Sequence, residues 1–487
     1  MSRINTNVPA LVSQRALRQN QQSLQLSLER LSTGLRINRG ADDPAGLMNS
    51  EKLRADISST NKAISNSQRA SNFIATSEGA LNEISSLLID MQGLIIQAAN
   101  DAAMSDEEKK ANQLQIDSAI DAITRIANST TYAGRNPLNG SLSYSTSGVQ
   151  ISELPNVNIT GAQFGTLPKI NVNVQVTASA QKGQLLWQHD AVPTGQQFYI
   201  KLSGANGATI FNWNSGVTGD SIITAVNAAS EATGVEAVWF NDAHHAEGIV
   251  FRSTQYGSDQ FVSIQNMSTT TTSLGIIDNR TGATAQSSSG QDAVALINGI
   301  SARGRGLNLS LNSRTLDMNL TLSEALGTNP GSTSSFAITG GGALFQVGPE
   351  VTTNHQAFLG IQSVAATELG NNTVGFLSQI ATGGPYAIID GINNCSHASD
   401  IVSEAIRQVA VLRGRLGAFE RSTLQSNINS LTVTMDNLTA SDSAIRDTDF
   451  AEETSKLSRA QILVNAGTSI LAMANVSSQN ILSLLKQ

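Results

Sequence analysis

The chain has 487 residues and a net charge of −8 at pH 7, and its length is enough for roughly two to four domains. The acidic balance argues against a nucleic-acid-binding surface, which would gather Lys and Arg. The single cysteine, Cys395, excludes an intrachain disulfide and a cysteine-based metal site. Proline is absent between residues 45 and 136 and after residue 385, so both flanks of the chain are free to form long helices.

The first segment, residues 1–40, predicts a long amphipathic helix. Leucines recur at spacings that place them on one helical face and that are typical of coiled-coil packing: Leu17, Leu24, Leu28, Leu31 and Leu35. Forty helical residues would extend roughly 60 Å at about 1.5 Å each. Such a stripe needs a partner from outside its own segment. The segment also lacks the uninterrupted apolar stretch of a secretory signal, so we expect no cleavable signal peptide.

Residues 57–98 predict a second helix whose apolar face can be buried inside a bundle. The pattern breaks at residues 99–104. Ser105 followed by Glu108 is the signature of a capping box, which predicts the start of a third helix. This third helix should end before Pro137.

The middle of the chain predicts β-structure. Residues 170–176 alternate strictly between apolar and polar side chains, as a half-buried strand does. Residues 197–202 and 248–252 are further candidate strands, and residues 220–232 predict a helix. Because this region is inserted between two helical flanks, we expect it to project as a separate lobe.

The C-terminal flank repeats the helical pattern, slips in phase near residues 421–425, and then resumes. The side chains that we expect to pack inside the bundle come from both flanks: Leu81, Ile84, Leu88, Met91, Ile95, Val409, Leu412, Leu416 and Phe419. The last segment carries a terminal stripe: Leu463, Ala466, Ile470, Met473, Ile481 and Leu484. Its longest apolar run is too short and too polar to span a bilayer, so we expect no membrane insertion.

Few residues suggest chemistry. Asp42 and Asp43 could bind a cation, but a turn and a helix N-cap before Pro44 is the favoured interpretation, because no further ligands cluster nearby. His244 and His245 lack the spacing of a zinc motif. No nucleophile–base constellation emerges, so we expect no enzymatic activity, no metal and no cofactor.

Ordered motifs at both ends resemble bacterial flagellin. In the N-terminal flank these are ERLSTGLRIN at residues 29–38, ADDPAG at 41–46 and SEGALNEI at 77–84. In the C-terminal flank they are IRDTDFA at 445–451, AQIL at 460–463, AGTSILA at 466–472 and QNILSLL at 479–485. Residues 342–348 and 359–364 are similar to the β-hairpin that flagellins pack on their inner bundle.

The resemblance implies a structural subunit of the extracellular flagellar filament, which is a homopolymer of many copies. It also implies export of the unfolded chain by the flagellar type III route, with an export chaperone and the hook-associated junction and cap proteins as partners. The implied fold is α+β: residues 1–44 and 441–487 as terminal coiled-coil helices, 45–141 and 336–440 as a helical bundle with a β-hairpin, and 142–335 as an inserted β-rich outer region.

Three other functions are compatible with parts of the sequence. A hook–filament junction protein shares the terminal helices but assembles into short rings, and it remains the alternative. An insert with hydrolase activity is disfavoured by the missing catalytic constellation. A non-flagellar adhesin is disfavoured by the paired terminal motifs.

Overall fold

A computed structural model describes residues 6–100, 104–165, 167–194, 197–267, 275–313 and 315–484, with the side chains of residues 390, 392–393 and 477–484 left out of the description. The chain divides into two compact units, and each is assembled from distant parts of the sequence. The first unit comprises Met1–Ser71, Gln346–Gln356 and Glu420–Gln487, and the second comprises Asn72–Phe345 and Ala357–Phe419.

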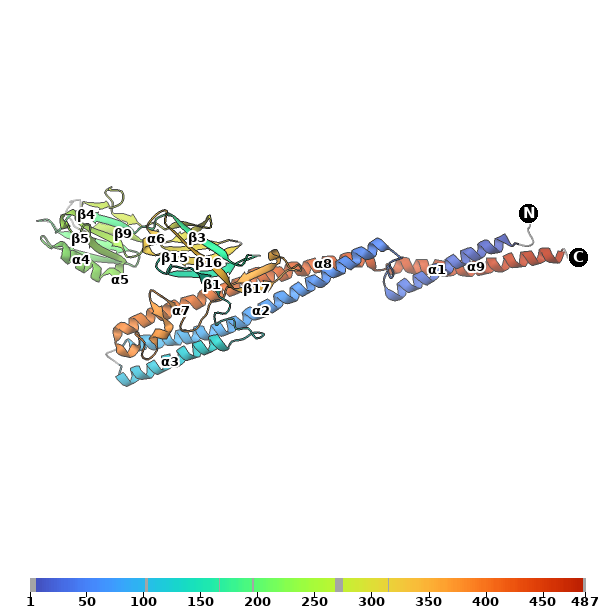
Figure 1. Ribbon diagram of the computed structural model, residues 1–487, viewed down its shortest axis with the longest axis horizontal. Helices are drawn as coiled ribbons and strands as arrows, with labels where there is room; N and C mark the ends of the chain where they lie inside the picture. The colour runs from blue at the N-terminus through green and yellow to red at the C-terminus, as the bar shows by residue number, and fades with distance from the viewer. Residues whose placement is uncertain are drawn as a thin grey trace. The chain divides into compact units, whose positions relative to one another are not determined.

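The terminal helices pair within the first unit. Helix α1 (Val8–Thr33) and helix α9 (Phe450–Leu484) run antiparallel, so α1 begins at the end of the pair where α9 ends (Figure 1). The side chain of Asn7 caps α1 by accepting a hydrogen bond from the Ala10 N–H at 3.1 Å. Gly34 ends the helix in the left-handed conformation (φ 75°), which glycine adopts without strain.

Helix α2 (Pro44–Ala98) is the longest helix described and begins earlier than the periodicity predicts. In the first unit its residues Ala63 and Ile64 pack with Leu431 of helix α8 (Ser426–Arg446). The second unit contains the rest of α2, together with α3 (Asp106–Ser129) and α7 (Ile392–Phe419). The predicted capping box at Ser105 is present. The bundle framework therefore follows the apolar periodicity of both flanks.

Helices α7 and α8 are joined by a π-helical turn, Glu420–Gln425. A π-turn adds a residue to the helical repeat and shifts the phase of everything that follows. The predicted slip near residues 421–425 is therefore confirmed and has a structural cause. Leu424, within the turn, is buried, and the Ser71 hydroxyl of α2 donates a hydrogen bond to Glu420.

An eight-stranded antiparallel sheet forms the first part of the inserted region, in the order β1-β16-β3-β12-β13-β14-β15-β2. Its strands are β1 Tyr144–Ser147, β2 Asn156–Ala162, β3 Ile170–Ala178, β12 Val294–Ile297, β13 Ile300–Arg305, β14 Asn308–Asn312, β15 Leu316–Thr321 and β16 Thr333–Gly341. Alternate residues of β3 are buried, as predicted. The expected boundary at residue 335 falls inside β16, while the domain boundaries as a whole stay a prediction.

Two four-stranded sheets form the rest of the insertion, in the orders β10-β4-β8-β7 and β11-β9-β5-β6. The strands are β4 Gln184–Trp187, β5 Phe198–Gly204, β6 Ala208–Trp213, β7 Val235–Trp239, β8 Ile249–Ser253, β9 Phe261–Asn266, β10 Ile276–Asp278 and β11 Ser287–Ser289. Helices α4 (Gly219–Ala228) and α5 (Ser230–Thr233) replace the single helix predicted for residues 220–232. The rings of Trp187 and Phe198 stack in the core, with their centroids 4.2 Å apart.

Short elements complete the chain. These are α6 (Glu324–Gly327), the strand pairs β17 (Ala343–Gln346) with β18 (Gln356–Leu359) and β19 (Gly370–Asn371) with β20 (Gly375–Phe376), and the 3₁₀ turns η2 (His245–Glu247), η3 (Thr353–His355), η4 (Leu377–Ile380) and η5 (Ile388–Asp390). Strands β17 and β18 pair where the family resemblance predicts a hairpin, but β18 ends at Leu359, so the predicted second segment, residues 359–364, lies almost entirely after it. The α+β class is confirmed. Among the described helices, none is long and apolar enough to cross a membrane.

Candidate assembly interface

Helices α1 and α9 cover one another along a seam with heptad spacing. On α1 the seam consists of Ala10, Ser13, Leu17, Asn20, Leu24, Ser27 and Leu31, and on α9 it consists of Glu453, Leu457, Ala460, Val464, Gly467, Leu471 and Ala474, all buried or half-buried. Small residues let the two backbones approach closely. A Cβ atom at Gly467 would lie 3.3 Å from Leu17 Cδ1, so a larger residue there would require a small shift of that leucine.

A polar layer closes the seam near the start of α9. The Ser27 hydroxyl donates to Glu453 Oε1 at 2.6 Å, and both side chains are buried. The other carboxylate oxygen, Oε2, lies 3.8 Å from Arg30 Nη1 and 3.7 Å from Lys456 Nζ. A buried carboxylate requires such partners, because an unpaired charge is costly away from water.

Backbone hydrogen bonds fix the end of the helix pair that lies away from the chain termini. Arg36 N–H donates to Arg446 O at 2.7 Å, and Thr448 N–H donates to Gly34 O at 2.9 Å. Leu35, a member of the predicted stripe, forms an isolated β-bridge with Asp447 and is half-buried.

The Asp42–Asp43 pair has structural partners. Asp42 Oδ2 accepts hydrogen bonds from the backbone N–H groups of Arg39 (2.8 Å) and Asn38 (3.0 Å), which hold the pKa of Asp42 below its usual range. Asp43 Oδ1 accepts from Gly46 N–H at 2.9 Å in the first turn of α2. The favoured interpretation of a turn and an N-cap is therefore consistent with the geometry.

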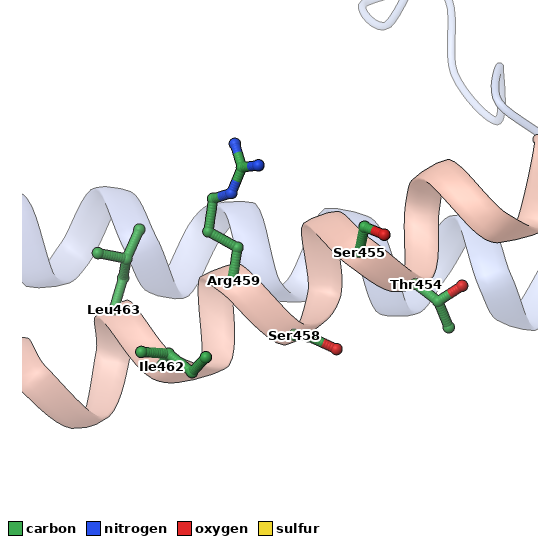
Figure 2. A pocket seen from close by; sticks show the side chains of 6 residues that line it. All are labelled: Thr454, Ser455, Ser458, Arg459, Ile462 and Leu463. Carbon is green, nitrogen blue, oxygen red and sulfur yellow. The ribbon is translucent and has the colours of Figure 1, made fainter.

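A second apolar stripe on α9 flanks the seam, about 100° around the helix from it. It contains predicted stripe residues: Leu463, Ile470 and Met473 have exposed fractions of 44%, 50% and 64%, and Ala466 is exposed as well. Further exposed apolar side chains of the helix pair are Val8, Leu11, Val12, Leu28, Ile462 and Val476. Figure 2 shows Ile462, Leu463 and Arg459 projecting from α9 beside a shallow groove that Thr454, Ser455 and Ser458 also line.

The predicted terminal stripe is thus divided between two surfaces. Leu17, Leu24 and Leu31 lie in the seam, whereas Leu28 is exposed. Ile481 and Leu484 lie outside the described side chains. Sequence reasoning missed the α9 side of the seam, because its Leu457, Val464 and Leu471 alternate with the small and polar residues Glu453, Ala460, Gly467 and Ala474.

The residues predicted to pack in the bundle lie in the second unit. Leu81, Ile84, Leu88, Met91, Ile95, Val409, Leu412 and Leu416 are buried. Phe419 is half-buried, and its ring centroid lies 5.9 Å from that of Phe345.

The candidate chemical residues do not converge on a site. His244 is exposed, and His245 stacks on Trp239 with ring centroids 4.1 Å apart. Cys395 is buried, and the ring of His397 contacts that of Tyr386. Within the described residues, no group of three or more His, Cys, Asp and Glu side chains could hold a metal ion.

Two family models match the flanks of the chain: the bacterial flagellin N-terminal helical region at residues 4–143 and the bacterial flagellin C-terminal helical region at residues 399–485. Curated relatives match 99% of this chain and 99% of their own length. They include Flagellin B of Helicobacter pylori (26% identical), B-type flagellin of Pseudomonas aeruginosa (28%) and the flagellin of Salmonella choleraesuis (27%).

A solved structure of Xanthomonas campestris FlgL aligns over 81% of this chain and 99% of its own, at 11% identity. Its TM-score of 0.29 is too low to establish a shared fold. The full-length relatives are flagellins, so the junction-protein alternative is not favoured. With both terminal regions matched and the relatives aligned end to end, the chain belongs to the bacterial flagellin family.

Proposed function

We propose that copies of this chain polymerise through the α1–α9 helix pair, whose outward apolar stripe is buried by neighbouring copies. As a flagellin, the chain is a structural subunit of the extracellular flagellar filament and serves motility. The observation that carries the proposal is the exposure of Leu463, Ile470 and Met473 on a helix whose adjacent face is already covered by α1.

The energetic argument favours burial of this stripe between subunits. A helix that is apolar on more than one face is normally buried on more than one face. Burying a Leu, Ile or Met side chain contributes about 1.5–3 kcal/mol. The exposed stripe can therefore offset much of the entropy lost when terminal helices become ordered, but only where neighbouring copies supply the second surface.

The remaining assignments extend this proposal. Residues 1–44 and 441–487 would line the filament's inner tube, residues 45–141 and 336–440 would form the surrounding bundle, and residues 142–335 would face the outside. Export of the unfolded chain by the flagellar type III route is compatible with a single cysteine, because no intrachain disulfide can hold the chain in a loop. An export chaperone and the junction and cap proteins would be its partners, and its role would be structural rather than enzymatic.

The stripe is tested by placing a charge in it. We expect Leu463→Asp to abolish filament growth from seeded monomer, because the buried interface would contain an unpaired carboxylate. The matched control is Ile210→Asp, which adds the same charge at a residue of similar exposure (53%) on edge strand β6.

Electron microscopy and far-ultraviolet circular dichroism provide the measurements. The expected result is unchanged helix content in both variants, with long filaments formed only by Ile210→Asp. Normal filaments from Leu463→Asp would contradict the proposal. Short rings from the unaltered chain would point to the junction-protein alternative.

A further inference from the structure

Three Asn–Gly dipeptides occur in the chain: Asn139–Gly140, Asn206–Gly207 and Asn298–Gly299. Because glycine has no Cβ, its backbone nitrogen can approach the side chain of the residue before it. That nitrogen can attack the amide carbon Cγ of the asparagine, and the side chain then loses ammonia. All three asparagines are exposed and have the dipeptide for this reaction, so the structure around each one decides which reacts.

The side chain of Asn298 is held on a neighbouring strand. Asn298 lies in the turn between β12 and β13, and its Oδ1 accepts a hydrogen bond from the Asn173 N–H at 2.8 Å. Its Nδ2 donates to Asn171 O at 2.9 Å. Strand β3, which supplies both partners, lies on the side of β12 opposite to β13. The amide is therefore drawn away from Gly299, and both hydrogen bonds must break before the reaction.

Asn206 is fixed against helix α5. Its Nδ2 donates to Glu231 O at 3.1 Å, which holds the amide nitrogen that would have to leave. Its backbone N–H donates to Thr233 O at 3.3 Å. The turn lies so close to α5 that a Cβ atom at Gly207 would be 2.8 Å from Ala232 O. The attack would therefore require this turn to leave the helix.

Asn139 has a geometry that favours the reaction. It lies in the loop between α3 and β1, and its Oδ1 accepts a hydrogen bond from the Ser141 N–H at 3.0 Å. This Asx turn closes a small ring that contains both Asn139 Cγ and Gly140 N, so it folds the amide carbon over the nitrogen that attacks it. The same hydrogen bond stabilises the negative charge that develops on Oδ1 during the attack.

The two nitrogens that take part in the reaction are also accessible. In the part of the chain that the structure describes, no hydrogen bond holds Asn139 Nδ2 or the Gly140 N–H. The amide nitrogen can therefore leave, and the backbone nitrogen can lose its proton to water.

An Asx turn without a following glycine does not meet the same conditions. Asn241 and Asn371 accept hydrogen bonds from the N–H groups of Ala243 and Thr373, two residues on, at 3.0 Å and 2.8 Å. Each is followed by a residue with a Cβ, which hinders the approach of the backbone nitrogen. They serve as internal comparisons, because they share the turn but lack the dipeptide.

We propose that Asn139 is a deamidation site and that the fold, rather than the dipeptide alone, selects it. The Gly140 nitrogen loses its proton and bonds to Cγ, and the Cγ–Nδ2 bond breaks so that ammonia leaves. Water then opens the cyclic imide. Opening at Cγ gives aspartate at position 139, and opening at the backbone carbonyl gives isoaspartate, whose main chain runs through Cβ. In total, asparagine and water give a carboxylate and ammonium.

The site lies where the chain passes from the helical bundle to the inserted region. The side chain of Leu138 is buried, and its backbone carbonyl accepts a hydrogen bond from the Val364 N–H at 3.0 Å. Gly140 packs on Ser363, whose Cβ would lie 3.2 Å from a Cβ atom added at the glycine. Isoaspartate adds a backbone atom between these two anchored residues, and either product adds a negative charge. Because the filament is extracellular, we expect the products to accumulate with its age.

Peptide mass spectrometry of the full-length chain, incubated at mildly alkaline pH, measures conversion at every asparagine in one sample. In the folded chain we expect residue 139 to convert about tenfold faster than residues 206 and 298, because those two must first lose hydrogen bonds. Residues 241 and 371 should convert more slowly still. In urea the difference among the three Asn–Gly sites should disappear, because the contacts around them are lost.

Two variants test the Asx turn itself. Ser141→Pro removes the N–H that donates to Asn139 Oδ1 and should slow conversion at residue 139 towards the rate of the other two sites. Ser141→Ala is the matched control, because both variants lose the hydrogen bond from the Ser141 hydroxyl to Asn136 O but only the alanine keeps the N–H. It should retain the fast rate. Circular dichroism checks that both variants are folded.

The inference is overturned if residue 139 converts no faster than residues 206 and 298 in the folded chain. It is equally overturned if the advantage of residue 139 persists in urea, since the local sequence would then be its cause. The urea comparison uses the unaltered chain, so it decides the matter even if Ser141→Pro does not fold. None of these results bears on the proposed assembly, which the Leu463→Asp variant tests separately.

Discussion

Asp292 shows how single carboxylates organise the inserted region. Its Oδ1 accepts hydrogen bonds from the backbone N–H of Gly306 at 2.7 Å and of Ser258 at 2.9 Å, and its Oδ2 accepts from the Ser258 hydroxyl at 2.6 Å. The residue immediately precedes Ala293 and strand β12, so it joins the eight-stranded sheet to the loop before β9. At this crossing the backbones are close: a Cβ atom at Gly257 would lie 2.8 Å from Gly306.

The stability of this junction should depend on pH. Burial raises the pKa of Asp292, but the hydrogen bonds from Gly306 and Ser258 outweigh it and lower the pKa below its usual value. A carboxyl whose pKa is lower in the folded state stabilises fully above the unfolded pKa of about 4, and this stabilisation is lost as pH falls through the folded pKa. We expect Asp292→Asn to destabilise by about 1–3 kcal/mol at pH 7. The difference from the unaltered chain should narrow towards pH 3.

Urea unfolding at a series of pH values measures this difference. Asp259→Asn is the matched control, since Asp259 pairs with Arg305 at 2.8 Å but both side chains are mostly exposed. An exposed pair contributes little, so its removal should change stability slightly at every pH. A pH-independent gap for Asp292→Asn would show that the carboxylate's charge is not what stabilises the junction.

At the scale of elements, periodicity identified the structure where one face of a segment is buried. Strand β3 has a single apolar face, and so does the part of α2 in the bundle. The spacing of apolar residues therefore predicted both elements. Helix α9 has two apolar sides, and spacing alone could not tell which one meets α1. The seam depends on Gly467 and Glu453, which gain their meaning only from Leu17 and Ser27 more than 400 residues away in sequence.

The π-helical turn between α7 and α8 carries a further prediction. Inserting one alanine after Gln425, where the regular helix α8 begins, would rotate the following residues by about 100°. Leu431 would then leave the cluster it forms with Ala63 and Ile64. We expect a loss of roughly 2–5 kcal/mol, as for removal of a buried leucine side chain.

Chemical denaturation of the soluble subunit, followed by circular dichroism, measures the loss. Thr423→Ala keeps the chain length and therefore the phase, so it should unfold close to the unaltered chain. An unchanged midpoint for the insertion would mean that α8 can pack on α2 in more than one phase.

At the scale of the whole molecule, the inserted region begins and ends at two strands that pair with each other. Strands β1 and β16 are neighbours, and Ser147 lies opposite Ala337 in their register. The sequence indicated an inserted lobe through its change from helical to alternating periodicity. It could not indicate the pairing order of the eight strands, because that order depends on contacts between residues such as Val157 and Leu320, which belong to opposite parts of the insertion.

This geometry makes the insertion removable. Replacing residues 148–336 with Asn-Gly would join Ser147 to Ala337 through a two-residue hairpin turn, a loop that favours these residues. Ile338, which loses its buried neighbours in the sheet, is changed to Thr in the same protein. Both terminal stripes, the α1–α9 seam and the buried bundle residues remain. We therefore expect seeded filaments with a smaller diameter, seen by electron microscopy, and the same inner helical repeat.

The control is the same deletion combined with Leu463→Asp, which should yield no filaments because assembly still requires the stripe. If the shortened chain keeps its helix content but does not polymerise, the inserted region itself supplies contacts between subunits, and the terminal helices are insufficient.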